Sequence, residues 1–363
     1  MKNIATELNS IVRTLFRYCA ELVLGTENPI TPNFQDAFGA HQRGAYNFAY
    51  KIYLPLADKG DVRAQYQLAE LYRYGKGVQK NYAKAVKCYK LAAEQGHLEA
   101  SCELGMIYLK GEGFEKDDHK AIKWFKIGAE LGNAKAQSIL GRMYYNASGV
   151  EKDLKAAVKW ARLASDQGRP QAHFMLGWLY ENGVGVKRDP KLAYWLYLFS
   201  AEGGCEEAQY PLGVSYFWGN GVEQDYLEAA KWISLSAKRG VPEAQYLLGW
   251  MYTFEKGMQL NFTEALNWCR LAAEQGYADA QAHLGGLYRY GIGVHQDFKK
   301  AALWFKLAAA QGTTNAQYLL GEMCHHGLGV PKNHKQSIKL YYLSADKGYP
   351  DTKFALPKVN IQN

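Results

Sequence analysis

The sequence has few cysteines and no long apolar run. The cysteines stand at unrelated places in the chain: Cys19, Cys88, Cys102, Cys205, Cys269 and Cys324. Scattered thiols of this kind fit a reducing compartment better than a disulfide-bonded scaffold. No apolar run reaches the roughly 18 residues of a membrane-spanning helix, so none is predicted. Residues 1–24 contain Glu7, Arg13, Arg17 and Glu21, which interrupt the apolar core of a signal peptide. We therefore expect a cytoplasmic protein; delivery by a specialised secretion system would leave no mark in these residues.

The motifs of the common catalytic and nucleotide sites are also missing. The chain has no P-loop, no H-E-x-x-H, no nucleophile elbow and no C-x-x-C. Its G-x-G-V segments follow a helical pattern rather than a strand and lack a third glycine, so we interpret them as turns. The group Cys324, His325, His326 and His334 matches no standard zinc spacing. The sequence predicts a non-enzymatic protein with no cofactor and no metal.

What the chain does contain is a 36-residue repeat, present eight times in register from Asp61 to Gly348. Counting Asp61 as position 1, position 4 is Ala and position 8 is Leu in every repeat, while position 9 is Gly and position 12 is Tyr in seven. Positions 4, 8, 11 and 12 share one face of a helix, which predicts a first helix over positions 3 to 14. A glycine inside a helix is unfavourable by itself, so we expect a neighbouring helix to approach closely at position 9.

A turn and a second helix complete each repeat. Position 17 is Gly in every repeat and position 15 in six, as a tight turn with positive φ requires. Position 21 is always Asp or Asn, which predicts the N-cap of the second helix. That helix has small residues at positions 25 and 33 and an apolar residue at position 31. Its position 28 is tryptophan in five repeats, which we interpret as core packing: Trp124, Trp160, Trp232, Trp268 and Trp304.

Prolines and two missing turn glycines mark local departures from the repeat pattern. Pro170, Pro190 and Pro242 stand at first helical positions, where the absent N–H is tolerated. Pro211 stands at position 7, inside the first helix of repeat five, and predicts a kink or a late helix start. Ala147 and Glu255 replace the turn glycine of repeats three and six.

The run A-x-x-x-L-G-x-x-Y-x-x-G-x-G-V, followed by D-x-x-x-A-x-x-W and A-x-x-G, resembles the Sel-1-like repeat, a relative of the tetratricopeptide repeat. The match covers residues 61–348. The resemblance implies an all-α fold, a right-handed α/α superhelix of about eight helix-turn-helix repeats with a capping helix at each end. It also implies a scaffold or adaptor for protein–protein interaction, with roles in complex assembly, signalling and, in bacteria, contact with host proteins. The cysteine pair that some secreted members carry in each repeat is absent.

The remaining residues predict the rest of the organisation. Residues 1–25 are expected as an amphipathic capping helix, 26–60 as a linker and half-repeat, and 349–363 as a partial helix and tail. A membrane-surface role for the first helix is the alternative, but its charges are balanced rather than lysine-rich. No oligomeric state is predicted.

In related tetratricopeptide arrays the first helices line a concave groove, and the resemblance maps that face to positions 3, 6, 10, 13 and 14. These positions hold six basic residues: Arg63, Arg73, Lys110, Lys135, Arg142 and Arg289. They hold seven acidic ones: Glu70, Glu99, Glu181, Glu207, Glu243, Asp279 and Glu322. A nucleic-acid groove is basic along its track, so the groove net charge of −1 disfavours a nucleic-acid partner. The excess positive charge is expected mainly on the second helices and the termini.

Aromatic residues concentrate on this face in repeats four to six, a composition typical of a protein-binding hot spot. The predicted partner-binding residues are Arg142, Tyr145, Phe174, Trp178, Tyr210, Phe217, Trp218, Tyr246, Trp250, Phe254 and Arg289. Burial between adjacent repeats is an equal alternative for Phe174, Tyr210 and Tyr246; we favour Trp178, Phe217 and Trp250 as exposed binders. The leading hypothesis is a groove that binds a peptide or a partner's helix. The alternative is a module that binds cell-wall or carbohydrate fragments on the same aromatic side chains.

Overall fold

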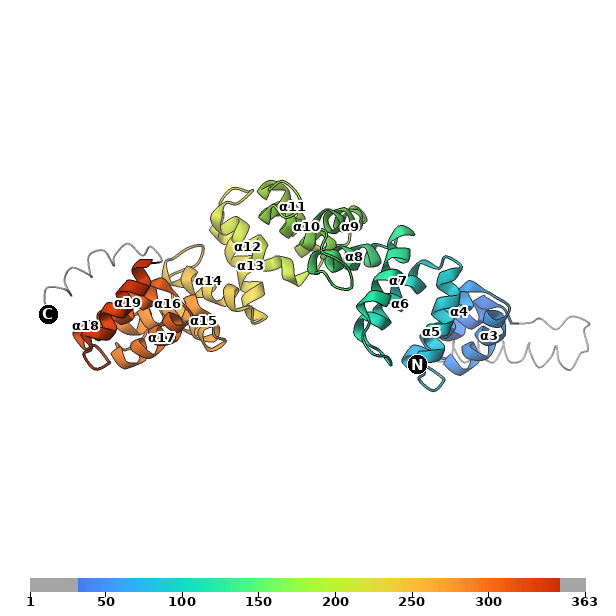
Figure 1. Cartoon of the computed structure of the whole chain (residues 1–363), viewed down its shortest axis with the longest axis horizontal. Helices are drawn as coiled ribbons and strands as arrows, with labels where there is room; N and C mark the ends of the chain where they lie inside the picture. The colour runs from blue at the N-terminus through green and yellow to red at the C-terminus, as the bar shows by residue number, and fades with distance from the viewer. Residues whose placement is uncertain (1–31, 347–363) are drawn as a thin grey trace, which may run out of the picture. The chain divides into compact units, whose positions relative to one another are not determined.

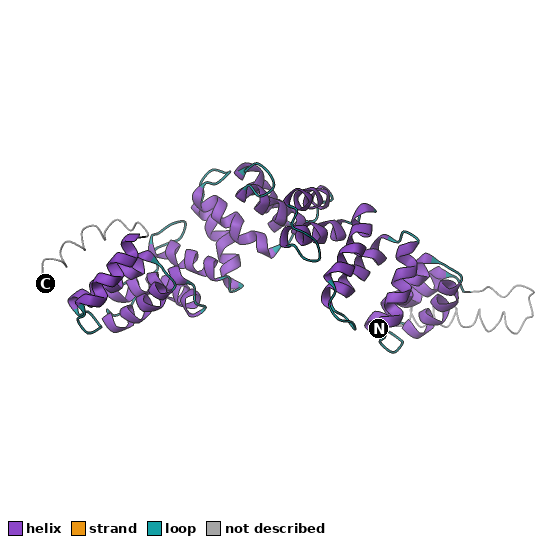
Figure 2. Ribbon diagram, viewed as in Figure 1, coloured by secondary structure: helices purple, strands orange, loops and turns teal. Residues whose placement is uncertain are grey.

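The computed structural model describes residues 32–346, and these residues form eighteen α-helices and one short 3-10 helix, with no strand (Figures 1 and 2). This confirms the predicted all-α class. The helices before the repeats are α2 (Phe34–Gln42) and α3 (Tyr46–Asp58). The first helices of repeats one to eight are α4 (Val62–Tyr74), α6 (Leu98–Lys110), α8 (Ala134–Asn146), α10 (Pro170–Asn182), α12 (Gln209–Trp218, preceded by the 3-10 helix η1, Glu206–Ala208), α14 (Pro242–Thr253), α16 (Ala278–Tyr290) and α18 (Thr314–His326). The second helices are α5 (Tyr82–Glu94), α7 (Asp118–Glu130), α9 (Leu154–Asp166), α11 (Pro190–Glu202), α13 (Tyr226–Lys238), α15 (Phe262–Glu274), α17 (Phe298–Ala310) and α19 (His334–Asp346).

The chain divides into two compact parts. Among the described residues, the N-terminal part comprises 32–137 and 147–151, and the C-terminal part comprises 138–146 and 152–346. In repeats one, two and four to eight, the first helix packs on the second helix of the same repeat, and within each part the second helix packs on the first helix that follows, as α5 does on α6 and α9 on α10. Both parts are therefore stacks of helical hairpins.

The repeat positions do in the structure what their periodicity predicts. Alanine at position 4 has no exposed surface in any repeat, and leucine at position 8 is buried in all eight. The Asp or Asn at position 21 caps every second helix by accepting a hydrogen bond from a backbone N–H of the first turn. Within each part, the apolar face of a hairpin is covered by its neighbours, which supplies most of the stabilising burial.

The glycine at position 9 lies where two helices of one repeat touch. A Cβ on Gly213 would stand 2.6 Å from Cγ1 of Ile233, and one on Gly285 would stand 2.8 Å from the Phe305 ring. Ile233 and Phe305 both occupy position 29 of their repeats. The predicted close approach is confirmed, and its partner is the buried position 29 of the second helix.

Pro211 delays the first helix of repeat five, as predicted. The segment Glu206–Ala208 forms a 3-10 turn, and the α-helix begins only at Gln209. Proline lacks the N–H that an earlier α-helical turn would need at this point, so the chain enters the helix through the tighter turn.

Residues 26–60, expected as a linker and half-repeat, hold two helices in the described part. Asn33 and Asp36 form a capping box at the start of α2, and α3 packs on α4. The helix expected in residues 1–25 and the partial helix expected after residue 349 lie outside the described residues.

Replacing Glu255 with glycine is expected to stabilise the protein by about 0.5–1 kcal/mol. Glu255 has a φ of 54°, whereas glycine occupies this turn position in six repeats. The left-handed conformation costs an L-residue roughly 1–2 kcal/mol, and the extra chain entropy of glycine offsets about 0.5–1 kcal/mol of that gain. Urea unfolding measures the change. Glu255→Ala is the control, since alanine keeps the Cβ and should leave stability almost unchanged; equal effects of the two variants would contradict the explanation.

Candidate functional site

Only part of the face predicted as the groove lies at the surface of the described residues, since Arg73 and Phe217 at position 13 and Cys102 and Ala282 at position 6 are buried. Position 14 of the first helix is exposed in all eight repeats, and position 10 is buried in none. The exposed residues at position 14 are Tyr74, Lys110, Asn146, Asn182, Trp218, Phe254, Tyr290 and His326. Two of these, Trp218 and Phe254, are among the predicted binding residues.

In repeats five and six, four aromatic side chains join into one surface feature, which we call the aromatic strip: Phe217, Trp218, Trp250 and Phe254. Their ring centroids are 4.8 Å apart for Phe217 and Trp218, 5.6 Å for Phe217 and Trp250, and 4.5 Å for Trp250 and Phe254. Trp218 is 68% exposed and Phe254 is also exposed, while Trp250 is half-buried. The strip thus has two open ends and a partly covered centre.

Phe217 corrects the prediction that it is an exposed binder. It is only 2% exposed. The rings of Trp218, Tyr226 and Trp250 surround it at centroid distances of 4.8 to 5.6 Å. Phe217 therefore supports the strip from below and has almost no surface to offer a partner.

Arg289 also differs from a free groove residue. Its guanidinium donates to Glu322 of the next repeat at 2.7 Å, and the Arg289 side chain is mostly buried. The ion pair bridges two neighbouring repeats, which indicates a structural role for Arg289 at the seam.

The other predicted residues lie in smaller groups. Tyr145 contacts Trp178 edge to face at 5.3 Å, and Phe174 lies against the buried Tyr197 at 6.1 Å. Trp178, Phe174 and Tyr145 are half-buried. Arg142 is exposed. Trp178 is thus partly covered by its neighbour but not sealed in the core.

Tyr210 and Tyr246, for which burial was an equal alternative, are half-buried. Burial raises the pKa of the Tyr210 hydroxyl and that of Tyr246, the latter to about 12. The Tyr246 ring contacts Tyr277 and His283. These two tyrosines belong to the seams between repeats and border the strip.

His283 lies beneath the open end of the strip. Its ring is 6.2 Å from that of Phe254, and its Nδ1 is 3.7 Å from Sγ of the buried Cys269. Burial lowers the pKa of His283 to about 4 and raises the pKa of Cys269 to about 12. At neutral pH the imidazole and the thiol are therefore uncharged, which suits a packing role and not nucleophilic chemistry.

The charge of the first helices in repeats four to six is entirely negative. They carry the acidic residues Glu181, Glu206, Glu207 and Glu243 and no Lys or Arg. The eight second helices carry eighteen Lys or Arg against nine Asp or Glu, a net charge of +9. The whole chain carries +8, so the positive excess resides on the second helices.

Sequence reasoning missed a row of exposed apolar residues on those second helices. Position 31 is 38–53% exposed in every repeat, although its apolar character suggested the core. The residues are Leu91, Ile127, Leu163, Phe199, Leu235, Leu271, Leu307 and Leu343. The core residue of the second helix is instead position 29, two residues earlier, which faces the first helix and is buried in every repeat. The position that packs in the core could have been identified from this spacing.

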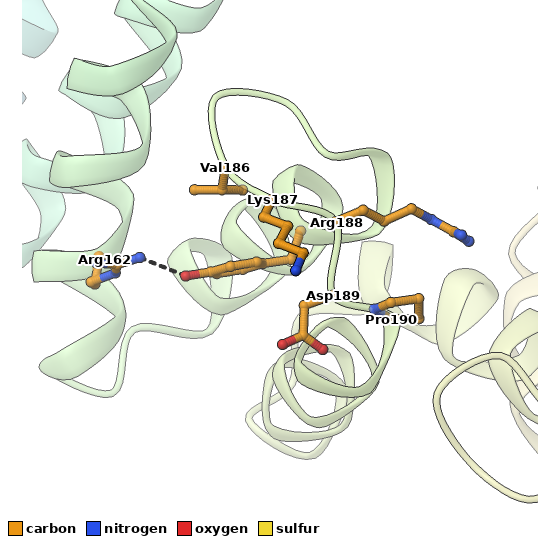
Figure 3. A pocket seen from close by; sticks show the side chains of 7 residues that line it. Arg162, Val186, Lys187, Arg188, Asp189 and Pro190 are labelled. Carbon is orange, nitrogen blue, oxygen red and sulfur yellow. Dashed lines mark hydrogen bonds between the residues drawn. The ribbon is translucent and has the colours of Figure 1, made fainter.

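A shallow recess of about 520 Å³ lies at the turn of repeat four (Figure 3). Arg162 donates to the Tyr180 hydroxyl at 2.5 Å, and Arg188 points away and donates to the carbonyl of Glu181. Asp189 is occupied as the N-cap of α11. The charged groups are thus committed mainly to the turn, and the recess holds no nucleophile beside a base.

The histidines of repeat eight lie close together, with Nδ1 of His325 3.2 Å from Nδ1 of His334. In the described part of the chain, no group of three or more His, Cys, Asp or Glu is arranged to hold a metal ion. Between residues 32 and 346, no helix has both the length and the apolar character needed to cross a membrane.

A family model described as the Sel1 repeat matches eight consecutive stretches of the chain: residues 62–97, 98–133, 134–168, 170–205, 206–241, 242–277, 278–313 and 314–349. None of the curated proteins matches the chain. Among solved structures, the chain is similar to c5321, a protective antigen of uropathogenic Escherichia coli strains with an SLR fold. The identity is 29%, with 90% of this chain and 82% of that one covered, at a TM-score of 0.71. A Sel1 repeat protein from Oxalobacter formigenes is 30% identical, with 85% and 89% covered, at a TM-score of 0.57.

Proposed function

We propose that this chain, which belongs to the Sel1 repeat family, is a protein-interaction scaffold that binds a partner's segment along the aromatic strip and the adjoining acidic helices. The observation that carries the proposal is the strip itself. Trp218 and Phe254 are large, exposed and held in place by ring contacts to Phe217 and Trp250. Rigid aromatic anchors in contact with water are the features from which binding hot spots are built.

Charge favours a segment that carries lysine or arginine. The first helices around the strip have no basic residue, and Glu243 is half-buried beside Tyr210 and Tyr277. A cation placed near these carboxylates and over the exposed indole of Trp218 gains both ion pairing and a cation–π contact. An acidic segment would meet like charge at the same place.

Selection of a random peptide library on the immobilised protein tests the proposal. We expect enrichment of peptides with a net positive charge and an aromatic or large aliphatic residue. A selected peptide should bind at least about 10-fold more weakly to the double variant Trp218→Ala/Phe254→Ala, because that change removes both exposed anchors. Raising the salt concentration should weaken binding further.

Tyr74→Ala is the matched control, because Tyr74 is 53% exposed at position 14 of repeat one, the same repeat position as Trp218 and Phe254. Unchanged peptide binding by the strip variant, with unchanged helical content, would place the binding surface elsewhere. Saturable quenching of tryptophan fluorescence by cell-wall oligosaccharides, together with failure of the peptide selection, would favour the carbohydrate alternative.

A further inference from the structure

The second helix of repeat four, α11, differs from the other seven on its outer side. Positions 24, 27, 30 and 31 are buried in no second helix. In every other repeat at least one of these positions is charged, and position 27 is lysine in five repeats. In α11 all four are apolar, namely Leu192, Trp195, Leu198 and Phe199.

These side chains form an exposed apolar face. Trp195 is 45% exposed and Phe199 is 53% exposed, and their rings stack at a centroid distance of 6.1 Å. Leu192, one turn before Trp195, is exposed as well. A helix that is apolar on all sides is normally covered on all sides, so we expect another protein surface to cover this outer face.

The second helices of the neighbouring repeats also carry exposed apolar residues. Ser165 of α9 contacts His173, whose ring lies 6.1 Å from Phe199. Trp232 of α13 packs against the core that contains Tyr194 and Tyr197 of α11. Leu163 on α9 and Leu235 on α13, the second helices of the repeats before and after, are exposed as well.

The charges at the ends of α11 indicate what covers it. Lys191 and Glu202 are its charged residues, they stand at opposite ends, and both are exposed. When two copies of α11 pack antiparallel across a two-fold axis, Lys191 of each copy meets Glu202 of the other. Parallel packing would oppose like charges. The face is thus self-complementary in one orientation, as an isologous interface requires.

We propose that this protein self-associates through α11, with the faces formed by Leu192, Trp195 and Phe199 of two copies packed antiparallel. The surface is separate from the aromatic strip, because it lies on the outer side of a second helix.

The primary test is analytical ultracentrifugation of the full chain over a range of concentrations. Wild type is expected to show a concentration-dependent dimer. The variant Trp195→Lys/Phe199→Leu, which gives α11 the residues found at these positions in repeats three and five, should dimerise at least about 100-fold more weakly. Leu303→Lys is the matched control: it makes the same kind of change at position 27 of α17 and should leave dimerisation intact.

Charge reversal tests the orientation. Lys191→Glu and Glu202→Lys should each weaken dimerisation several-fold, and the double variant should recover it. An equimolar mixture of the two single variants should associate more tightly than either alone, because unlike charges then meet at both ends.

Several results would overturn the proposal: a wild-type monomer at every concentration, a dimer that the Trp195→Lys/Phe199→Leu change leaves intact, or an equal loss in Leu303→Lys. A monomer in which the Trp195 side chain is protected from oxidative labelling would show that another part of the same chain covers the face, and this would overturn it as well. Peptide binding at the aromatic strip should be unaffected by the α11 variants, so the two proposals fail independently.

Discussion

Replacing Arg73 with methionine is expected to destabilise the protein by about 3 kcal/mol, the size of effect seen when one partner of a buried ion pair is removed. The Arg73 side chain is only 4% exposed. Its guanidinium donates to Glu103 at 2.6 Å and, through two nitrogens, to Glu112 at 2.9 and 3.2 Å. Methionine fills a similar volume but leaves the carboxylate of Glu112 without its two-point partner.

The pKa of Glu103 shows how strongly Arg73 stabilises the neighbouring carboxylate. Burial by itself raises the pKa of this carboxyl, but the hydrogen bonds from Lys135 and Arg73 outweigh burial and hold the pKa below its usual value. Without Arg73, Lys135 alone remains to compensate the charge. Urea unfolding at neutral pH measures the loss. Arg63→Met is the control, because the Arg63 side chain is largely exposed and pairs with Asp61 at 3.4 Å, which is worth little. A loss below about 1 kcal/mol for Arg73→Met would show that the network contributes little to stability.

Lowering the pH from about 7 to about 4.5 is expected to remove about 2 kcal/mol of stability through His283 alone. Its pKa falls from 6.5 to about 4 because burial disfavours the charged imidazole. Between these two values the unfolded chain binds a proton that the folded chain does not. This contribution is therefore present above pH 6.5 and is lost as the pH falls toward 4.

The variant His283→Leu isolates this contribution, because leucine occupies the same repeat position at Leu247 and Leu319. Unfolding free energies of both proteins at the two pH values give a double difference in which the other titrating groups cancel. We expect the variant to lose about 2 kcal/mol less than wild type on acidification. Equal losses would show that His283 remains accessible to protons in the folded state.

Most of the repeat could be predicted because its constraints are local. The Asp or Asn at position 21 satisfies a backbone donor three residues away, and the glycines at positions 15 and 17 adopt positive φ within their own turn. Even the late helix start at Pro211 follows from one missing N–H. Such requirements are visible in a short window of sequence, and repetition in eight copies separates them from chance.

The candidate site could be predicted only in part. Phe217 and Trp218 are adjacent on one helix, yet Phe217 is buried and Trp218 is largely exposed to solvent. Positions 13 and 14 of the pattern both border the surface, and which of them turns inward depends on the ring packed against it from the next repeat. The same limit applies to Arg289, whose partner Glu322 stands 33 residues further along the chain.

The amino-acid sequence by itself determined the hairpin, its caps and its turns, since each rests on contacts within about one repeat. The tertiary structure decided which apolar and charged side chains remain at the surface. It turned position 29 inward and left position 31 exposed, paired Arg73 with two carboxylates of the next repeat, and left α11 with an uncovered apolar face. The physical reason is that burial depends on the neighbouring helices, and the residues that supply them lie tens of positions away in the chain.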